Sequence, residues 1–475
     1  ADSIHFLVTM FYNMRHGISK REAIVESLRI NLQPIFLTSL TTAIGFLSMN
    51  FSDAPPFRDL GNIVAVGVTF AFLFSILFLP ALMSLLPVRV RPYRDDRKHA
   101  MDRFADFVVR RRKALFRGML LFIILMIAGL SRIEFDDRFV EYFDARYTFR
   151  TDIDFVTDNL TGIYNIDYSL SAGGEGMVSD PAYLAKVDEF AVWYRKQEGV
   201  LHVNTITDTM KRLNRNMHGD RDDCYTLPES REFSAQYLLL YELSLPYGLD
   251  LNNQIDIKKS ATRFSVTLGS LATRDILALE ERAQQWLREN APEHMRFHGA
   301  SPTIMFSHIA KRNIWSMLVG TGMALVLISA ILIFALKSFR IGMISLIPNF
   351  IPAFMAFALW GLLFKYVGLA LSVVTAMSLG IVVDDTIHFL SKYLRARREH
   401  GMNIEESVRY SFCTVGMALW VTTIILVAGF SVLTYSGFAL NSDMGLLTAI
   451  AIVFALLVDF LFLPTLLMKM KEENK

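Results

Sequence analysis

The sequence has little cysteine and none of the short motifs that mark common catalytic sites. Two cysteines, Cys224 and Cys413, occur among 475 residues, and because we expect them on different sides of a membrane, they predict no disulfide framework. No Cys/His spacing of a metal site, no Ser/His/Asp order and no GxGD signature of an intramembrane aspartyl protease is present. Gly173, Gly174 and Gly176 lack the spacing of a phosphate-binding loop, so we interpret them as a turn. The sequence therefore predicts no enzyme, no metal site and no cofactor.

The chain also lacks a strong net charge. Its formal net charge is +2, and its basic residues lie beside apolar runs, so nucleic acid is not an expected partner. Apolar residues are in excess, because 53% of the chain is hydrophobic and the mean hydropathy is +0.35. Such a chain is too apolar for a soluble enzyme, and it is typical of several membrane spans with a water-soluble domain.

An initiator methionine and a signal peptide are absent from the start of the sequence. Residues 1–13 are apolar, like the end of a membrane helix, but a full span needs about 20 residues. We therefore expect the chain to begin inside a longer protein, with its N-terminal half missing.

Long apolar runs alternate with basic connectors along the rest of the chain. Basic connectors lie on the cytoplasmic side of most membrane proteins, which predicts that the large polar segment after residue 131 faces outward, into the periplasm. The predicted segments are the end of a truncated fourth span (1–13), a cytoplasmic amphipathic helix (14–31), two spans that end a first half (32–86), a basic cytoplasmic linker (87–113), the first span of a second half (114–131), a periplasmic α+β domain (132–312), five further spans (313–468) and a cytoplasmic tail (469–475).

The α+β domain shows two strand–helix–strand patterns in tandem. Alternating apolar residues predict strands over 163–172, 200–207, 261–268 and 295–298, with helices over 181–197 and 274–290 between the members of each pair. Two such units predict an α+β sandwich of the split βαβ type.

A polar cluster interrupts the most apolar part of the second half. Gly380, Asp384 and His388 follow one another at helical spacing, and Asp385 lies three residues before His388, so the imidazole can reach either carboxylate. A carboxylate removed from water binds a proton more readily, and charge at mid-membrane is costly. We interpret the cluster as a site that handles protons, with a structural contact between helices as the alternative.

Parts of the first ninety residues recur near the C-terminus in the same order. Because an even number of predicted spans separates the copies, this is a parallel repeat of the kind that builds transporters with a site between two halves. The matched segments are 2–7 with 385–390, 45–46 with 429–430, 59–61 with 443–445, and 78–80 with 462–464. Asp2 is therefore equivalent to Asp385, whereas Ala1 stands where the second copy has Asp384.

Several neighbours of the acids allow two interpretations each. Thr422 and Thr423, and their equivalents Thr38 and Ser39, could donate hydrogen bonds to the carboxylates or be ordinary packing hydroxyls. The histidines His5 and His388 could pass protons or only orient an aspartate. Asp59 and Asp443 are interpreted as helix N-caps. For Asp459 no shared transport role is expected, since its equivalent in the first copy is Ser75.

With these motifs the chain resembles the resistance-nodulation-division (RND) superfamily of proton-driven exporters, in its MMPL-like branch of predicted lipid exporters. The resemblance is carried by Gly380-x-x-x-Asp384-Asp385, by the paired FLP motifs and by the placement of the polar domain. It implies an α-helical membrane bundle in two halves, each with periplasmic, ferredoxin-like βαβ porter subdomains. It also implies that Asp384, Asp385 and Asp2 are proton-relay carboxylates. The chain departs from the pattern at Ala1, which leaves a single acid in the first copy.

The sequence thus predicts a secondary active transporter of the bacterial inner membrane, which exports hydrophobic or amphiphilic molecules, above all lipids, as protons flow inward. Sodium in place of the proton is an open alternative. Two other functions stay open, a sterol-sensing or Patched-like lipid-binding protein without vectorial transport and a translocation motor of the SecDF kind. The expected partners are membrane lipids, the substrate, the missing N-terminal half, periplasmic proteins and further copies of the chain.

Overall fold

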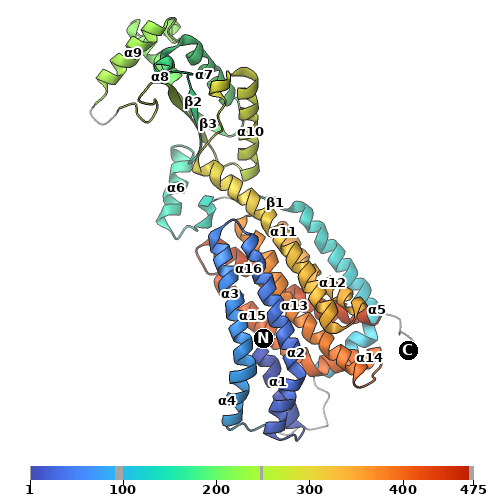
Figure 1. Cartoon of the computed structure of the whole chain (residues 1–475). Coiled ribbons are helices and arrows are strands. Elements are labelled where there is room, and N and C mark those ends of the chain that lie inside the picture. The colour runs from blue at the N-terminus through green and yellow to red at the C-terminus, as the bar shows by residue number, and fades with distance from the viewer. Residues whose placement is uncertain (1, 91–99, 138, 247–249, 470–475) are drawn as a thin grey trace. The chain divides into compact units, whose positions relative to one another are not determined.

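The computed structural model describes residues 2–90, 100–137, 139–246 and 250–469. Three predicted features therefore lie partly or wholly outside the described residues: Ala1, part of the basic linker (91–99) and most of the tail (470–475). The chain forms two compact units (Figure 1). The membrane unit comprises the residues up to Phe135 and from Arg312 onward, and the α+β unit comprises Asp136–Lys311.

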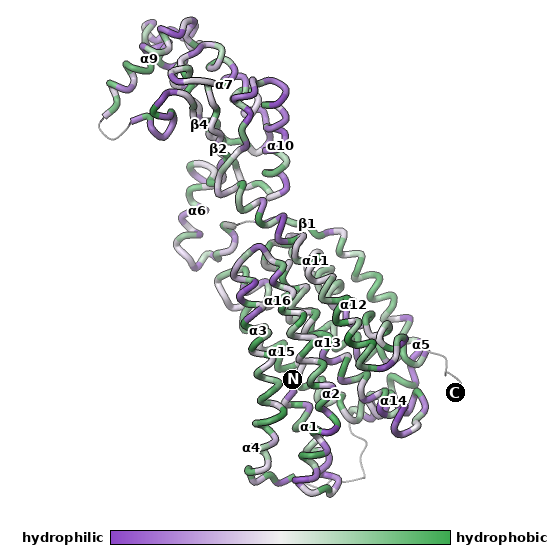
Figure 2. The backbone as a smooth tube through the Cα atoms, viewed as in Figure 1, coloured by the Kyte–Doolittle hydropathy of each residue, from purple (hydrophilic) through white to green (hydrophobic). Residues whose placement is uncertain are grey.

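Long helices make up the membrane unit. Eight helical segments in the described part of the chain are long and apolar enough to cross a membrane, and Figure 2 shows that hydrophobic residues dominate along them. The helices are α1 (Asp2–Arg15), α2 (Lys20–Leu47), α3 (Pro55–Leu73), α4 (Leu79–Leu85), α5 (Ala100–Ile127), α11 (Pro302–Leu336), α12 (Phe339–Leu363), α13 (Leu369–Arg398), α14 (Ile404–Ser411), α15 (Met417–Leu433), α16 (Ala439–Leu457) and α17 (Leu463–Leu467).

Two boundaries differ from the sequence prediction. The predicted amphipathic helix and the span after it form one continuous helix, α2, which starts at the N-cap Ser19 and runs through Pro34. The chain turns earlier instead, at Gly17, whose φ of 88° favours glycine. Helix α5 begins at Ala100, before the predicted start of its span, because the arginines that precede the apolar run are themselves good helix formers.

Equivalent positions of the internal repeat share local geometry. Phe74–Phe78 (η2) and Val458–Phe462 (η9) are both π-helical turns, and each leads directly into a Leu-Pro pair. A Cβ atom added to Gly61 would lie 2.5 Å from the carbonyl oxygen of Phe46, and one added to the equivalent Gly445 would lie 2.7 Å from that of Phe430. Both glycines therefore permit the same close helix approach.

The α+β unit is built on one antiparallel sheet. Its strands are β2 (Tyr164–Ser171), β3 (Val200–Asn204) and β4 (Ala261–Leu268), in the order β2-β4-β3. Alternate residues of β4 are buried, as period-two patterning requires. The helices of the unit are α6 (Thr148–Asn159), α7 (Pro181–Tyr194), α8 (Ile206–Met217), α9 (Arg231–Ser244) and α10 (Thr273–Asn290). Two further short strands, β1 (Glu134–Phe135) and β5 (Tyr366–Val367), pair in parallel within the membrane unit.

Aromatic rings fill the core of the α+β unit. Phe190 of α7 stacks on Phe264 of β4 and on Trp286 of α10, with ring centroids 4.8 and 5.0 Å apart. The hydroxyls of Tyr168 and Tyr194 are 2.7 Å apart and share a hydrogen bond, which satisfies both buried groups. Helices α7 and α10 are thereby fixed to the sheet.

The strand predicted at 295–298 is not formed, so the second strand–helix–strand unit is incomplete in the described residues. Glu293–Met295 (η7) is a 3₁₀ turn instead. The carbonyl of Phe297 accepts a hydrogen bond from the Gln284 side chain at 2.8 Å, so this backbone group is satisfied without a strand partner. One isolated antiparallel bridge, between Asp167 and Ala300, is what joins this segment to β2.

Candidate functional site

Helix α13 is the most enclosed of the candidate spans, and it carries the polar cluster. In its most apolar window 83% of the residues are buried, against 17% for Pro55–Leu85. Helix α2 packs against it closely enough that Gly45 lies on Gly380, and the Thr42 hydroxyl donates to the Gly380 carbonyl at 2.8 Å. Gly380 therefore allows α2 and α13 to pack closely, and its carbonyl accepts a hydrogen bond from α2.

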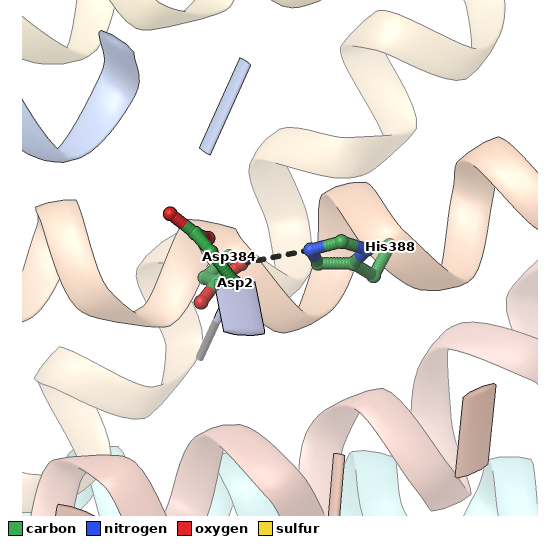
Figure 3. A group of neighbouring side chains, drawn as sticks. All are labelled: Asp2, Asp384 and His388. Atoms are coloured by element: carbon green, nitrogen blue, oxygen red, sulfur yellow. Dashed lines mark ion pairs between the residues drawn. The ribbon is translucent and has the colours of Figure 1, made fainter. Parts of the chain in front are cut away.

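Two acids and a histidine from distant parts of the sequence meet beside this contact. A carboxylate oxygen of Asp2, one of Asp384 and a ring nitrogen of His388 all lie within 4.8 Å of one another, as Figure 3 shows. The dashed line in that figure joins His388 Nε2 to Asp384 Oδ1 at 3.4 Å. The structure thus brings together three of the residues that the sequence singled out.

Hydroxyls of α2 hold Asp2 in place. Thr38 donates to its Oδ1 at 3.4 Å, and Ser39 donates to its Oδ2 at 3.0 Å. Thr38 also donates within its own helix, to the carbonyl of Ile35 at 3.0 Å, and its equivalent Thr422 makes the matching bond, to the carbonyl of Leu419 at 2.9 Å. Thr423 lies near Asp385 but is not in hydrogen-bonding geometry with any described residue. Both interpretations of these hydroxyls therefore have an example in the bundle.

The two predicted histidines lie face to face. The rings of His5 and His388 are 3.5 Å apart between centroids, with 4° between their planes. They come from equivalent positions of the repeat, on α1 and α13, and they are 1% and 0% exposed. Within the described chain none of their four ring nitrogens has a hydrogen-bond partner. Buried polar atoms without partners are rare in folded proteins and mark this pair as a functional candidate.

A further acid, Asp459, lies against α13. Thr386, the residue that follows Asp385, donates to Asp459 Oδ1 at 2.9 Å. No sequence pattern connects Asp459 with the cluster, because the repeat pairs it with Ser75. The structure nevertheless places it next to the acids of α13.

A buried lysine continues the line of polar residues, and the sequence interpretation missed it. Its place shortly before Arg395, Arg397 and Arg398 predicts a position in the basic connector after α13, but Lys392 is 3% exposed and donates to Asn31 Oδ1 at 3.1 Å. With Asp384 and His388 it forms an i, i+4, i+8 series, which puts the three side chains on one face of α13. That spacing was the signal that could have identified it.

The donor set could also hold a small cation. Asp2 and Asp384 offer carboxylate oxygens, and His388 offers a nitrogen. Hard cations such as sodium prefer oxygen, whereas transition metals accept imidazole. No spacing within the sequence could predict this set, because Asp2 lies on a different helix from the other two residues.

An apolar pocket of about 490 Å³ is lined by α15 and by the π-helical turn η9 that carries Asp459. Trp420, Thr423 and Ile424 of α15 line it together with Phe460 and Leu461 of η9. Thr423 therefore borders the pocket and also lies near Asp385. Pockets of this size and character suit apolar ligands.

The comparisons with known proteins agree with this architecture. The model of the MMPL family matches residues 6–115 and 258–470. The chain is 30% identical over 138 residues to the sulfolipid-1 exporter MmpL8 of Mycobacterium tuberculosis, a match that covers 28% of this chain and 13% of that protein. It is 29% identical over 142 residues to the putative membrane protein MJ1562 of Methanocaldococcus jannaschii, which covers 29% of this chain and 36% of the relative. The matches thus span little of these relatives' lengths.

Among solved structures, the fold is similar to the hedgehog release protein Disp of the water bear Hypsibius dujardini. The TM-score is 0.61 at 14% identity, over 98% of this chain and 62% of that one. It is also similar to SecDF, with a TM-score of 0.51 at 13% identity, over 98% of this chain and 52% of that one. At such identities the likeness concerns the fold alone.

Proposed function

The chain belongs to the MMPL family, and from that premise we propose that it acts in a secondary exporter of hydrophobic or amphiphilic molecules driven by the proton-motive force. The observation that carries the proposal is the enclosed cluster of Asp2, Asp384 and His388. The named mycobacterial relative exports a sulfolipid, which makes a lipid the leading substrate class. The apolar pocket beside Asp385 supports the same class, because its wall suits acyl chains.

Charge repulsion inside the cluster supplies the coupling. Asp2 and Asp384 lie within 4.8 Å of each other, and two ionised carboxylates at that separation repel by about 3.5 kcal/mol at an effective dielectric of about 20. A proton that binds between them removes this repulsion. One proton that crosses a membrane at 100 mV contributes about 2.3 kcal/mol, so the driving force and the local response are of similar size. Both the free energy from the membrane potential and the repulsion between the carboxylates are large enough to shift the packing of α1 against α13.

The proposed topology follows the basic residues. The end of α13 that carries Arg395, Arg397 and Arg398 is assigned to the cytoplasm of a bacterial cell, and the α+β unit to the periplasm. Protons would enter from the outer side and leave past Lys392. A sodium ion held by the oxygens of Asp2, Thr38 and Ser39 would be the alternative coupling ion.

The test uses the protein in liposomes that contain a fluorescent phospholipid, with an imposed pH gradient. The double variant Asp384→Asn/Asp385→Asn should abolish gradient-driven lipid movement, because amides cannot bind the transported proton. Asp59→Asn is the matched control, since Asp59 is exposed and its loss should leave transport unchanged. If the double variant still transports, the proton role is wrong. Lipid binding with no movement under any gradient would favour a sterol-sensing or Patched-like binding protein.

A further inference from the structure

Asp459 is a fully buried acid whose partners do not account for its charge. It lies in the π-helical turn η9 and is 0% exposed. Its Oδ1 accepts the hydrogen bond from Thr386, while its Oδ2 has no hydrogen-bond partner among the described residues. A buried ionised carboxylate normally has a cation or several donors around it. With one donor and a free oxygen, Asp459 is better suited to the protonated form.

The first copy of the repeat shows which kind of side chain is sufficient for packing at this position. Ser75 occupies the equivalent place in the π-helical turn η2, and its hydroxyl lies 3.0 Å from that of Ser3. Ser3 is the equivalent of Thr386. The same contact between a π-helical turn and the neighbouring helix therefore forms with a serine. Since a neutral hydroxyl is sufficient for the packing, the carboxylate of Asp459 adds something that packing does not require.

The surroundings of Asp459 contain a second acid and little else that is charged. Of the helices packed against η9, α13 presents Asp385. Helices α5, α12 and α16 contribute the apolar side chains that pack around Val458 and Phe462, including Met119, Met355 and Phe454. Three ionisable residues of α5 and of the segment after α17 have partners elsewhere: Asp102 with Cys413, Asp106 with Arg409, and Lys469 over the ring of Phe116.

We propose that Asp459 binds a proton of its own, beside the acids of α13. As a proton-coupling element this inference rests on the proposed function, but its proton binding can be measured independently. A fully buried carboxylate with one hydrogen-bond donor and one oxygen without a partner among the described residues favours its protonated form. The π-helical turn fits such a role, because π-bulges occur frequently at functional sites.

The proposal is tested by infrared spectroscopy of the protein in lipid nanodiscs during a pH titration. The carbonyl stretching band of protonated carboxylic acids should lose the contribution of about one acid per chain in Asp459→Ser. This variant installs the residue of the other copy, whose hydroxyl can keep the contact with Thr386, so folding should be retained. The reciprocal variant Ser75→Asp should gain a similar contribution, because it places an acid in the equivalent π-helical turn.

An unchanged band in Asp459→Ser would overturn the proposal. If the serine variant does not fold, Asp459→Asn provides the same readout with a side chain of nearly the same shape. The outcome is distinct from failure of the proposed function: transport that survives the loss of Asp384 and Asp385 would remove the exporter mechanism, and the infrared band would still show whether Asp459 holds a proton.

Discussion

Substitution of Gly45 by alanine should loosen α2 from α13, and the size of the effect follows from one contact. A Cβ atom at position 45 would lie 2.9 Å from the Cα atom of Gly380 and 3.2 Å from the carbonyl oxygen of Ala376. Carbon atoms in good contact are about 3.5–4.0 Å apart, so the new methyl is too close by at least about 0.6 Å. Both obstacles are backbone atoms, which cannot rotate away, and the helices must therefore separate.

The sum of three energy contributions predicts a net loss of stability for the contact between α2 and α13. Overpacking of this kind costs about 1–3 kcal/mol. Separation also weakens the 2.8 Å hydrogen bond from Thr42 to Gly380, which adds about 1 kcal/mol. The better helix propensity of alanine returns about 1 kcal/mol. A net destabilisation of about 1–3 kcal/mol corresponds to about a 5- to 150-fold faster exchange of those α13 amides that open when the helices part.

Hydrogen exchange read by mass spectrometry on the protein in nanodiscs measures this effect. The repeat supplies the matched control, because Gly429 is equivalent to Gly45 but has no atom within 4 Å of its added Cβ. Gly429→Ala should leave the exchange of α13 as it is, or slow the exchange of α15 slightly. Wild-type exchange in Gly45→Ala, or equal acceleration in both variants, would refute the steric argument.

Three further predictions concern single side chains. An amine-acylating reagent should modify exposed Lys196 but leave Lys392, which is 3% exposed, unmodified; equal modification in peptide mass spectra would contradict its burial. Asp180→Ala should destabilise the start of α7 by about 1 kcal/mol, because the carboxylate caps two backbone amides, and unchanged amide exchange there would argue against the cap. Partial burial alone would raise the pKa of Asp256, but hydrogen bonds from Ser260 and the backbone beside it lower that pKa. The protection of the Ser260 amide should therefore be full above about pH 4 and fall as the pH drops through the lowered pKa; an equal fall in Asp256→Asn would show that another group is responsible.

Periodicity predicted much of the fold, because it depends on local alternation. The strand predicted over 261–268 is β4, with alternate residues buried, and the helix predicted over 274–290 is α10 within one residue. The strand predicted at 295–298 is not formed, and the Phe297 carbonyl in this segment is paired with a non-local group, the side chain of Gln284 in α10. A short apolar run does not reveal which partner its backbone will choose.

The part of the candidate site that the internal repeat covers could be predicted from the sequence. The equivalence of Asp2 with Asp385 predicted that acids from both copies would meet, and Asp2 indeed lies beside Asp384. Lys392 was missed because arginines that follow it in sequence favoured a surface position, although its side chain turns inward. The contact of Asp459 with Thr386 of α13 could not be predicted, because it depends on a π-helical turn, and such a turn leaves no plain periodic signal in the sequence.

The stacking of the His5 and His388 imidazoles limits how much positive charge the pair can carry. At 3.5 Å between rings, two imidazolium ions would repel by about 5 kcal/mol at an effective dielectric of about 20. That penalty exceeds what one proton gains from a 100 mV potential, about 2.3 kcal/mol. The two imidazoles are therefore not expected to carry a positive charge at the same time. If they take part in proton transfer, the pair can hold at most one added proton, because their spacing on α1 and α13 disfavours a second.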